Sequence, residues 1–304
     1  MKKNVIVICL ILICGTQLFA QKKWFVSFNT GYALKMSSQN LYNEDLEFYF
    51  YNSNRHYDGE DQSSYGTDEQ INTSIGKGFN FSLSGGYMFN ENFGIEMGFS
   101  YLMGGKTLSN YEYYSKQIYY DDNWNPVSYD YSHCYENAIS SKMFRMNPSL
   151  LFNAGNKTIN PYAKVGLIIG IGSILYERTE LYEDEYDNQN DQTSIKFKMN
   201  GGISFGCSAA LGLNYNIGKN IALFGEVHLI SMSYSPKKGT IIEYTENGKN
   251  ELNELTTSEK EINFVNEFDY SSDDNESDYK PTTMLQYKFP FSSFGFNVGV
   301  KIKF

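Results

Sequence analysis

Apolar and polar residues alternate strictly through the last stretch of the chain, FGFNVGVKIKF, residues 294–304. Seven earlier segments show the same period of two, which is the pattern of a β-strand with two different faces. The eight alternating segments are 24–36, 79–89, 93–103, 143–153, 161–175, 199–215, 221–234 and 294–304. No stretch keeps helical spacing of apolar residues over three turns, so we predict an all-β protein.

The segments are long and their connections alternate in length. Each segment could cross a bilayer as a tilted strand, which takes about 9–11 residues, whereas strands of soluble proteins average about five or six. Short turns follow the second, fourth and sixth segments, and the long connections are 37–78, 104–142, 176–198 and 235–293. Such alternation is typical of an antiparallel up-and-down transmembrane β-barrel with long extracellular loops. We predict eight strands, or ten if the last connection adds a hairpin.

Charge follows the same division. The four long connections hold 32 of the 35 Asp and Glu residues and most of the 26 Tyr residues. Because these connections are polar and poor in aliphatic residues, we expect them to bury no core of their own, although parts of them extend the barrel strands. The Asn-Gly pair at 247–248 predicts a two-residue hairpin turn within the last connection.

The first 20 residues have the order of a secretory signal peptide: Lys2 and Lys3, an apolar run, and a small residue, Ala20, at the expected cleavage point. We therefore divide the chain into a signal peptide, 1–20, and a barrel domain, 21–304. A lipoprotein anchor on Cys14 is the alternative, which the bulky residue before it disfavours. Of the two remaining cysteines, Cys134 falls in a predicted loop and Cys207 in a predicted strand, and we expect both to stay unpaired.

Alternation alone does not tell which face meets lipid, because a soluble barrel also alternates. The secretory signal, the uncharged apolar faces and the small residues on the polar faces favour apolar side chains outside and polar ones inside. Pro148 and Pro290 cannot donate to a strand ladder, so we expect a bulge or a strand boundary at each.

The signal segment, the eight segments and the C-terminal FGFNVGVKIKF together resemble the eight-stranded outer-membrane barrels of the OmpA, OmpX and OmpW type. They are most similar to the outer membrane protein beta-barrel domain proteins of Bacteroidota-type bacteria. The resemblance implies the outer membrane of a Gram-negative bacterium, with loops extracellular and termini periplasmic. It also implies lipid and lipopolysaccharide as surroundings, and Phe304 as the C-terminal signal that the barrel assembly machinery reads. We expect no OmpA-type peptidoglycan-binding domain after the barrel segments.

With apolar residues outside, a set of charged side chains points into the lumen. These are Lys35, Glu96, Arg145, Lys164, Glu226, Lys301 and Lys303, joined by His228. Four of them, Glu96, Lys164, Glu226 and Lys301, lie near the short turns and could form one layer of mixed charge. Buried charges need partners, so we expect a salt-bridge plug that closes the lumen. The alternative is a narrow, porin-like channel for small polar or ionic solutes.

The sequence offers little chemistry of other kinds. His228 has no nucleophile nearby in sequence, so we expect no enzymatic activity and no cofactor. The acidic run 183–191 lacks the spacing of a calcium loop, so we expect no metal site, although divalent ions could still bridge the loops to lipopolysaccharide. Tyr-rich stretches such as 111–120 could bind an extracellular ligand or form an aromatic girdle. The acidic loops and the lack of a basic stripe disfavour nucleic acid.

Overall fold

The computed structural model describes residues 23–36, 39–40, 42–43, 48–49, 51–58, 63–120, 123–155, 158–267 and 278–304. The predicted signal peptide, 1–20, and Cys14 lie outside the described residues. The protein is all-β, as predicted, with one short helix among the described residues. No helix in this part of the chain has the length and apolar character needed to cross a membrane.

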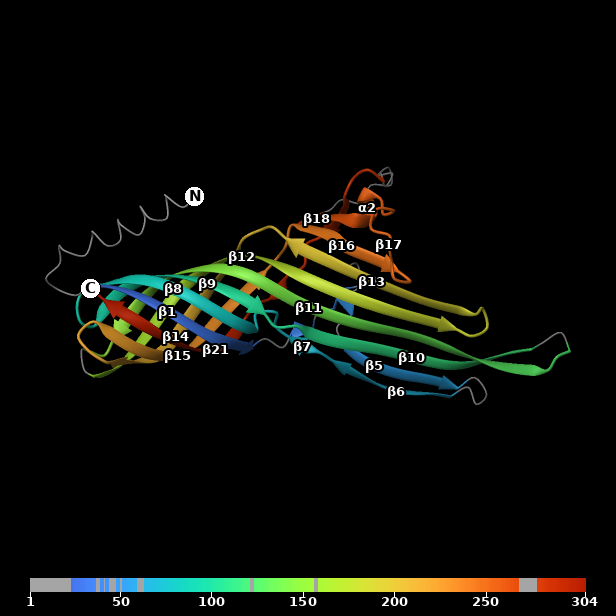
Figure 1. The fold of residues 1–304 in the computed structure, drawn as a ribbon, viewed down its shortest axis with the longest axis horizontal. Helices are drawn as coiled ribbons and strands as arrows, with labels where there is room; N and C mark the ends of the chain where they lie inside the picture. Colours follow the sequence, from blue (N-terminus) through green and yellow to red (C-terminus); the bar gives the residue numbers. More distant parts are fainter. Residues whose placement is uncertain are drawn as a thin grey trace.

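Eight strands form a closed set of antiparallel pairs, which we call the strand ring (Figure 1). They are β1 (Trp24–Lys35), β8 (Gly78–Met88), β9 (Phe93–Gly104), β11 (Pro126–Asn153), β12 (Ile159–Asp184), β14 (Ser204–Asn216), β15 (Ile221–Tyr234) and β21 (Ser293–Lys303). Each strand pairs with the next in this order, and β21 pairs with β1 over eleven residue pairs, from Phe25↔Lys303 to Lys35↔Ser293. Since β15 pairs directly with β21, the last long connection inserts no further hairpin between them.

The prediction of eight strands is wrong for the chain as a whole, because the long connections are themselves built of strands. β11 has 28 residues and β12 has 26, so both run far beyond the ring, to roughly 90 Å at about 3.3 Å per residue. Above β9, β10 (Thr107–Tyr120) continues the pairing along β11, and above β14, β13 (Gln189–Asn200) continues it along β12. We call this projecting sheet the extension.

Shorter elements lie in the long connections. They are β2 (Gln39–Asn40), β3 (Tyr42–Asn43), β4 (Phe48–Tyr49), β5 (Tyr51–Asp58), β6 (Ser63–Gln70), β7 (Asn72–Thr73), β16 (Lys238–Glu246), β17 (Lys249–Asn250), α2 (Thr257–Lys260), β18 (Glu261–Val265), β19 (Thr282–Leu285) and β20 (Phe289–Pro290). β5 pairs in parallel with β10, and β16 pairs with β13. β5 and β16 thereby widen the sheet of β10 to β13, which leaves the ring at the end opposite the C-terminus (Figure 1).

Local sequence explains several boundaries. Asn247 and Gly248 both have positive φ, 50° and 77°, and close the predicted two-residue hairpin between β16 and β17. The predicted strand 199–215 is wrong at its start, because Gly201 and Gly202, both at φ 81°, separate the end of β13 from β14. Left-handed backbone of this kind suits Gly and ends a strand ladder.

The two prolines behave differently. Pro148 lies within β11, where it stays in register with Met97 of β9, so the predicted bulge or boundary is wrong at this position. Its ladder to β12 lacks the two pairs at 147–148 and resumes in the same register at Ser149↔Gly166. At Pro290 the predicted boundary is confirmed, because this residue ends β20 and β21 begins at Ser293.

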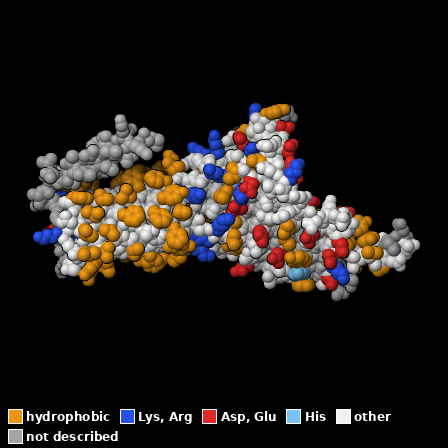
Figure 2. Space-filling model, in the orientation of Figure 1, with side chains coloured by type: hydrophobic (Ala, Val, Ile, Leu, Met, Phe, Trp, Pro, Cys, Tyr) orange, Lys and Arg blue, Asp and Glu red, His pale blue; other side chains and the backbone are white. Residues whose placement is uncertain are grey.

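The two faces of the ring are those predicted from the alternation. In β21, Phe296, Val298, Val300 and Ile302 are exposed, whereas Asn297 and Lys301 are buried. The same holds around the ring, so its outer surface is an apolar band (Figure 2). Exposed apolar side chains on this scale are unfavourable in water, so the band requires a lipid environment or a partner.

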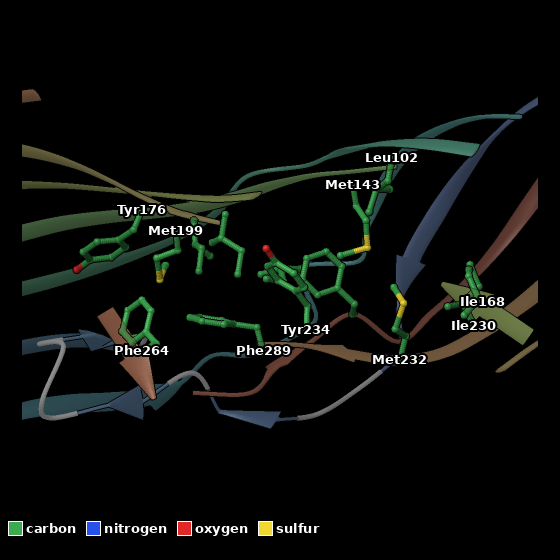
Figure 3. Close-up of a cluster of buried hydrophobic side chains, with 14 of the residues drawn as sticks. Leu102, Met143, Ile168, Tyr176, Met199, Ile230, Met232, Tyr234, Phe264 and Phe289 are labelled. Carbon is green, nitrogen blue, oxygen red and sulfur yellow. The ribbon is translucent and has the colours of Figure 1, made fainter. Parts of the chain in front are cut away.

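The expectation that the long connections bury no core is also wrong. A buried apolar cluster, the mouth cluster, fills the space where the ring meets the extension (Figure 3). Its buried members are Ile75, Leu102, Ile139, Met143, Ile168, Ile174, Tyr176, Phe197, Met199, Ile230, Met232, Tyr234, Phe264, Phe289 and Phe291. The connections are polar on average, but their few apolar residues fall at inward positions and meet the ends of the ring strands.

Candidate functional site

Six of the eight side chains that were predicted to point into the lumen lie inside the strand ring. Glu96, Arg145, Glu226, His228 and Lys301 are at most 8% exposed, and the side chain of Lys164 is 11% exposed. They come from β9, β11, β12, β15 and β21, which are brought together only by closure of the ring. Alternation with period two explains the result, because each lies at an inward position of its strand.

Lys164 is the centre of the charge layer. Its Nζ lies 2.9 Å from Glu96 Oε1 and 2.9 Å from Glu226 Oε2, so one ammonium bridges two carboxylates. Tyr162 donates a hydrogen bond to Glu226 Oε2 at 2.8 Å, and Asn297 Nδ2 donates to Glu226 Oε1 at 3.0 Å. This density of partners offsets the cost of removing the charges from water.

Lys301 belongs to an aromatic layer rather than to the ion pairs. Its Nζ lies 4.6 Å from the ring centroid of Phe25, 5.1 Å from that of Tyr162 and 5.7 Å from that of Phe224, distances at which cation–π attraction acts. These three rings and Leu151 form a second buried cluster next to the short turns, which we call the turn cluster.

Sequence reasoning missed the turn cluster because apolar residues were assigned to the outer face. A signal was present: Tyr162 and Phe224 each precede a lumen charge by two residues, so they share its inward position.

Arg145 and His228 lie further from the short turns. Arg145 is 1% exposed and donates through Nη2 to Asn80 Oδ1 at 2.5 Å. Both side chains line a polar cavity of about 70 Å³, together with Asn29, Glu96 and other small or polar residues. The mouth cluster begins directly beyond it, since Ile168 and Ile230 belong to both the cavity wall and that cluster.

Two lysines that were expected in the lumen lie at its ends. Lys35 is exposed and donates to the backbone oxygen of Asn72 at 3.0 Å. Lys303 is half-buried and donates to Asn216 Oδ1 at 2.8 Å. Both have inward register, but each is the last residue of its strand, where a long side chain can turn towards the rim.

The segment before β8 reinforces closure at the mouth. Ser141 Oγ donates to the backbone oxygen of Ile75 at 2.6 Å, and Ser74 Oγ donates to that of Ser292 at 2.6 Å. Tyr234 OH lies 2.7 Å from the backbone oxygens of both Gly172 and Gly201. These bonds fix the mouth cluster to the surrounding strands, so the cavity is enclosed between two apolar layers.

Side-chain type changes sharply along the outer surface. Along the long axis, from the ring towards the extension, the apolar band is followed by exposed lysines and then by the extension, which is rich in Asp and Glu (Figure 2). We call the exposed lysines at this boundary the lysine belt: Lys35, Lys106, Lys142, Lys198, Lys237 and Lys238. Lys106 pairs with Glu177 of β12. The order is apolar, basic, then acidic.

The extension holds its own polar and aromatic cluster. His133 Nε2 lies 2.6 Å from Glu180 Oε1, and Arg178 Nη2 lies 3.3 Å from Glu180 Oε2. The Arg178 guanidinium also lies 4.2 Å from the centroid of the Tyr135 ring. Burial and the nearby Glu180 raise the pKa of Tyr135 to about 12. His133 and Cys134 belong to β11, so the prediction that this part of the chain is a loop is wrong.

An open pocket of about 780 Å³ lies near the far end of the extension. His56 stacks between Tyr65 and Tyr114, with ring centroids 5.1 Å and 5.3 Å apart. The Tyr-rich stretch 111–120 belongs to β10, and its residues Tyr114 to Lys116 line part of the pocket. Acidic residues, including Asp130 and Glu183, also line the pocket.

Cys134 and Cys207 are free thiols on different strands, as expected. Among the described residues, no group of three or more His, Cys, Asp or Glu side chains is arranged to hold a metal ion.

Comparison with known proteins places the chain among outer-membrane proteins. A family model described as "Outer membrane protein beta-barrel domain" matches residues 6–268. No curated protein matches the chain.

Similar experimental structures include the outer membrane protein OprG of Pseudomonas aeruginosa, with 11% identity, a TM-score of 0.37, and coverage of 93% of this chain and 97% of OprG. Ail, the attachment invasion locus protein of Yersinia pestis, in complex with the heparin analogue sucrose octasulfate, has 10% identity, a TM-score of 0.30, and coverage of 93% and 99%. CarO of Acinetobacter baumannii has 16% identity, a TM-score of 0.27, and coverage of 75% and 92%.

Proposed function

Because the chain belongs to the outer membrane protein beta-barrel domain family, we propose that the strand ring is an eight-stranded barrel that crosses the outer membrane. Its role is structural or surface-interacting rather than enzymatic, and the lumen is closed. The observation that carries this proposal is the layering of the lumen: the turn cluster, the bridged charges around Lys164 and the mouth cluster follow one another.

The surface order supports an orientation. The apolar band contacts the hydrocarbon core, the lysine belt meets anionic lipid or lipopolysaccharide at the outer interface, and the acidic extension is extracellular. Both ends of the ring sequence then lie at the periplasmic side, where the Phe304 backbone N–H donates to Trp24 O at 2.9 Å. Residues 1–20 act as a cleaved signal peptide in this proposal, and the mature protein begins at Gln21.

The extension supplies the surface-interaction part of the proposal. It is anchored by the continuous strands β11 and β12, so its pocket near His56 is held at a distance from the membrane by rigid elements. Its acidic and Tyr-rich lining suits a neutral or cationic extracellular ligand and disfavours nucleic acid.

Conductance in planar bilayers tests closure of the lumen. We expect the wild-type protein to give no discrete conductance steps, because the apolar mouth cluster blocks the water path. Replacing two of its members, Met143→Gly with Met232→Gly, should produce leak if these side chains form the barrier. The narrow-channel alternative predicts wild-type steps whose size changes in Glu96→Gln or Glu226→Gln.

Deletion of Phe304 tests the proposed recognition by the barrel assembly machinery. We expect the truncated chain to insert poorly into outer membranes, while Phe304→Trp, which keeps a terminal aromatic, inserts normally. The measurement is the fraction of protein that shows heat-modifiable gel migration in the outer-membrane fraction. Normal insertion of the truncation would contradict this role.

A further inference from the structure

The charges buried in the strand ring do not balance. Two carboxylates, Glu96 and Glu226, face three basic groups, Lys164, Lys301 and Arg145. Lys164 bridges both carboxylates, and Lys301 lies in the aromatic layer beside them. Neither Lys301 nor Arg145 forms an ion pair with a carboxylate among the described residues, but Lys301 lies against three aromatic rings and near Glu96 and Glu226. Arg145 is therefore the basic group left over.

Arg145 is also incompletely hydrogen-bonded. Its Nη2 donates to Asn80, but its buried Nε and Nη1 have no protein partner within the described chain. At 1% exposure, this guanidinium cannot reach bulk solvent. A buried cation without a counter-charge is strongly unfavourable, and arginine stays protonated even when it is buried. A bound species that supplies negative charge or acceptor atoms would therefore be favourable here.

His228 points to the same place. It is 6% exposed, lines the same cavity as Arg145, and neither of its ring nitrogens has a protein partner. A neutral imidazole always carries one N–H donor. The cavity is thus lined by unused donors from two strands, β11 and β15, that lie apart in the sequence. It is also lined by unused acceptors, Asn29 Oδ1, Glu96 Oε2 and Asn297 Oδ1, which ordered water beside a bound species can satisfy.

We propose that this cavity is a binding site for a halide-sized monovalent anion, with chloride as the ligand, held by Arg145 and His228. The anion makes the buried charge neutral, since it adds one negative charge to two carboxylates and three cations. The cavity volume of about 70 Å³ exceeds the roughly 10–15 Å³ that one water needs by the same measure, so a halide and ordered water fit together. This volume leaves no room for a lipid phosphate or a sugar acid.

Closure of the lumen determines how the anion enters. The turn cluster and the mouth cluster enclose the cavity on both sides, so the site is loaded while the barrel assembles and exchanges slowly afterwards. The proposal concerns a structural anion, so it is independent of whether the extension binds an extracellular ligand.

The test compares full-length protein refolded in sodium chloride, sodium bromide or sodium gluconate at equal ionic strength. We expect bromide to give an anomalous scattering peak in the cavity beside Arg145 in crystals. We also expect gluconate, which is too large to enter, to lower the temperature at which the barrel loses its folded gel migration. The drop should be at least about 3 °C and should saturate with added chloride.

Two variants at the site and one control variant separate this site from a general salt effect. Arg145→Met removes both the charge and the donors, so its unfolding temperature should be the same in chloride and in gluconate. If that variant does not fold, His228→Gln keeps the guanidinium and should raise the chloride concentration needed for half-maximal stabilisation. Arg55→Met, a change in the exposed extension, should keep the wild-type dependence.

The proposal is overturned if the cavity of the bromide-refolded protein shows water alone, for example a water between Arg145 and Glu96. Equal unfolding temperatures of the wild-type protein in chloride and gluconate would overturn it as well.

Discussion

The ring and the extension share the strands β11 and β12, yet their inner and outer faces carry opposite types of residue. In the ring polar side chains face inward and apolar ones outward, whereas the base of the extension has the reverse arrangement. Along β11, Arg145 and Ser149 face inward in the ring, whereas Ile139 faces inward at the base of the extension. On the outer face, Phe144 is 49% exposed in the ring, and Glu136 is exposed in the extension. The change occurs near Met143 without any break in the strand. Strand geometry is therefore common to both regions, and the surrounding solvent decides which residues each face carries.

The comparison predicts different costs for removing a paired lysine in each region. Lys164→Met leaves Glu96 and Glu226 buried without their shared cation, which should lower the free energy of unfolding by about 3–5 kcal/mol. In the extension, Lys196→Met breaks a pair with Glu243 whose side chains are 38% and 44% exposed, so the loss should be about 0–1 kcal/mol. Urea unfolding in lipid vesicles measures both. Equal losses would mean that the ring interior is as well solvated as the extension.

The second largest difference is expected when an arginine is placed on the outer face of each region, because its cost in stability depends on whether that face meets lipid or water. Leu83, the middle residue of β8 in the ring, and Leu181 in the extension are 54% and 40% exposed, so both lie on an outer face. Leu83→Arg should cost about 2–4 kcal/mol, because its site lies near the bilayer midplane in the proposed orientation. Leu181→Arg should change stability by only about 0.5 kcal/mol, because its site faces water. The fraction of folded protein in vesicles reports both, and a small cost at Leu83 would argue against lipid contact.

The smallest expected effect is alkaline weakening of the extension. The pKa of Tyr135 is raised from 10 to about 12, so the folded protein keeps a proton that the unfolded chain loses first. Its stabilising contribution is complete below pH 10 and disappears as the pH rises through about 12.

Hydrogen exchange on β10 and β11 should therefore accelerate over this range. Tyr135→Phe, which cannot ionise, should reduce the acceleration, while exchange in the ring strands should change less. An identical pH response in the variant would exclude Tyr135 as the cause.

How much the sequence predicts differs between the two regions for a physical reason. In the ring, lipid outside and a narrow lumen inside impose strict alternation, so the bounds of β9, β15 and β21 are predicted within about one residue. The six lumen residues follow from the same rule. In the extension both faces tolerate polar residues, so alternation is weak, and β10 and β13 form because β11 and β12 provide edges with which they pair.

Contacts between segments that are distant in the sequence could not be predicted either. The mouth cluster joins Phe264 and Phe289 to Met143 and Met199, and no local pattern indicates that these residues meet. Likewise, the ion pairs of Lys164 were expected as a mixed layer, but the aromatic surroundings of Lys301 depend on three separate strands. Local periodicity predicts the direction of a side chain, whereas its partners depend on strand register and ring closure.

The central claim is that the outer face of the ring meets lipid and that of the extension meets water. Tryptophan quenching by lipids brominated in mid-chain tests it most directly, with the native Trp24 and Trp124 replaced by Phe. The account predicts strong quenching of a probe introduced by Leu83→Trp, in the middle of β8, and little quenching of one introduced by Leu181→Trp. Equal quenching at the two positions, or stronger quenching at position 181, would contradict it.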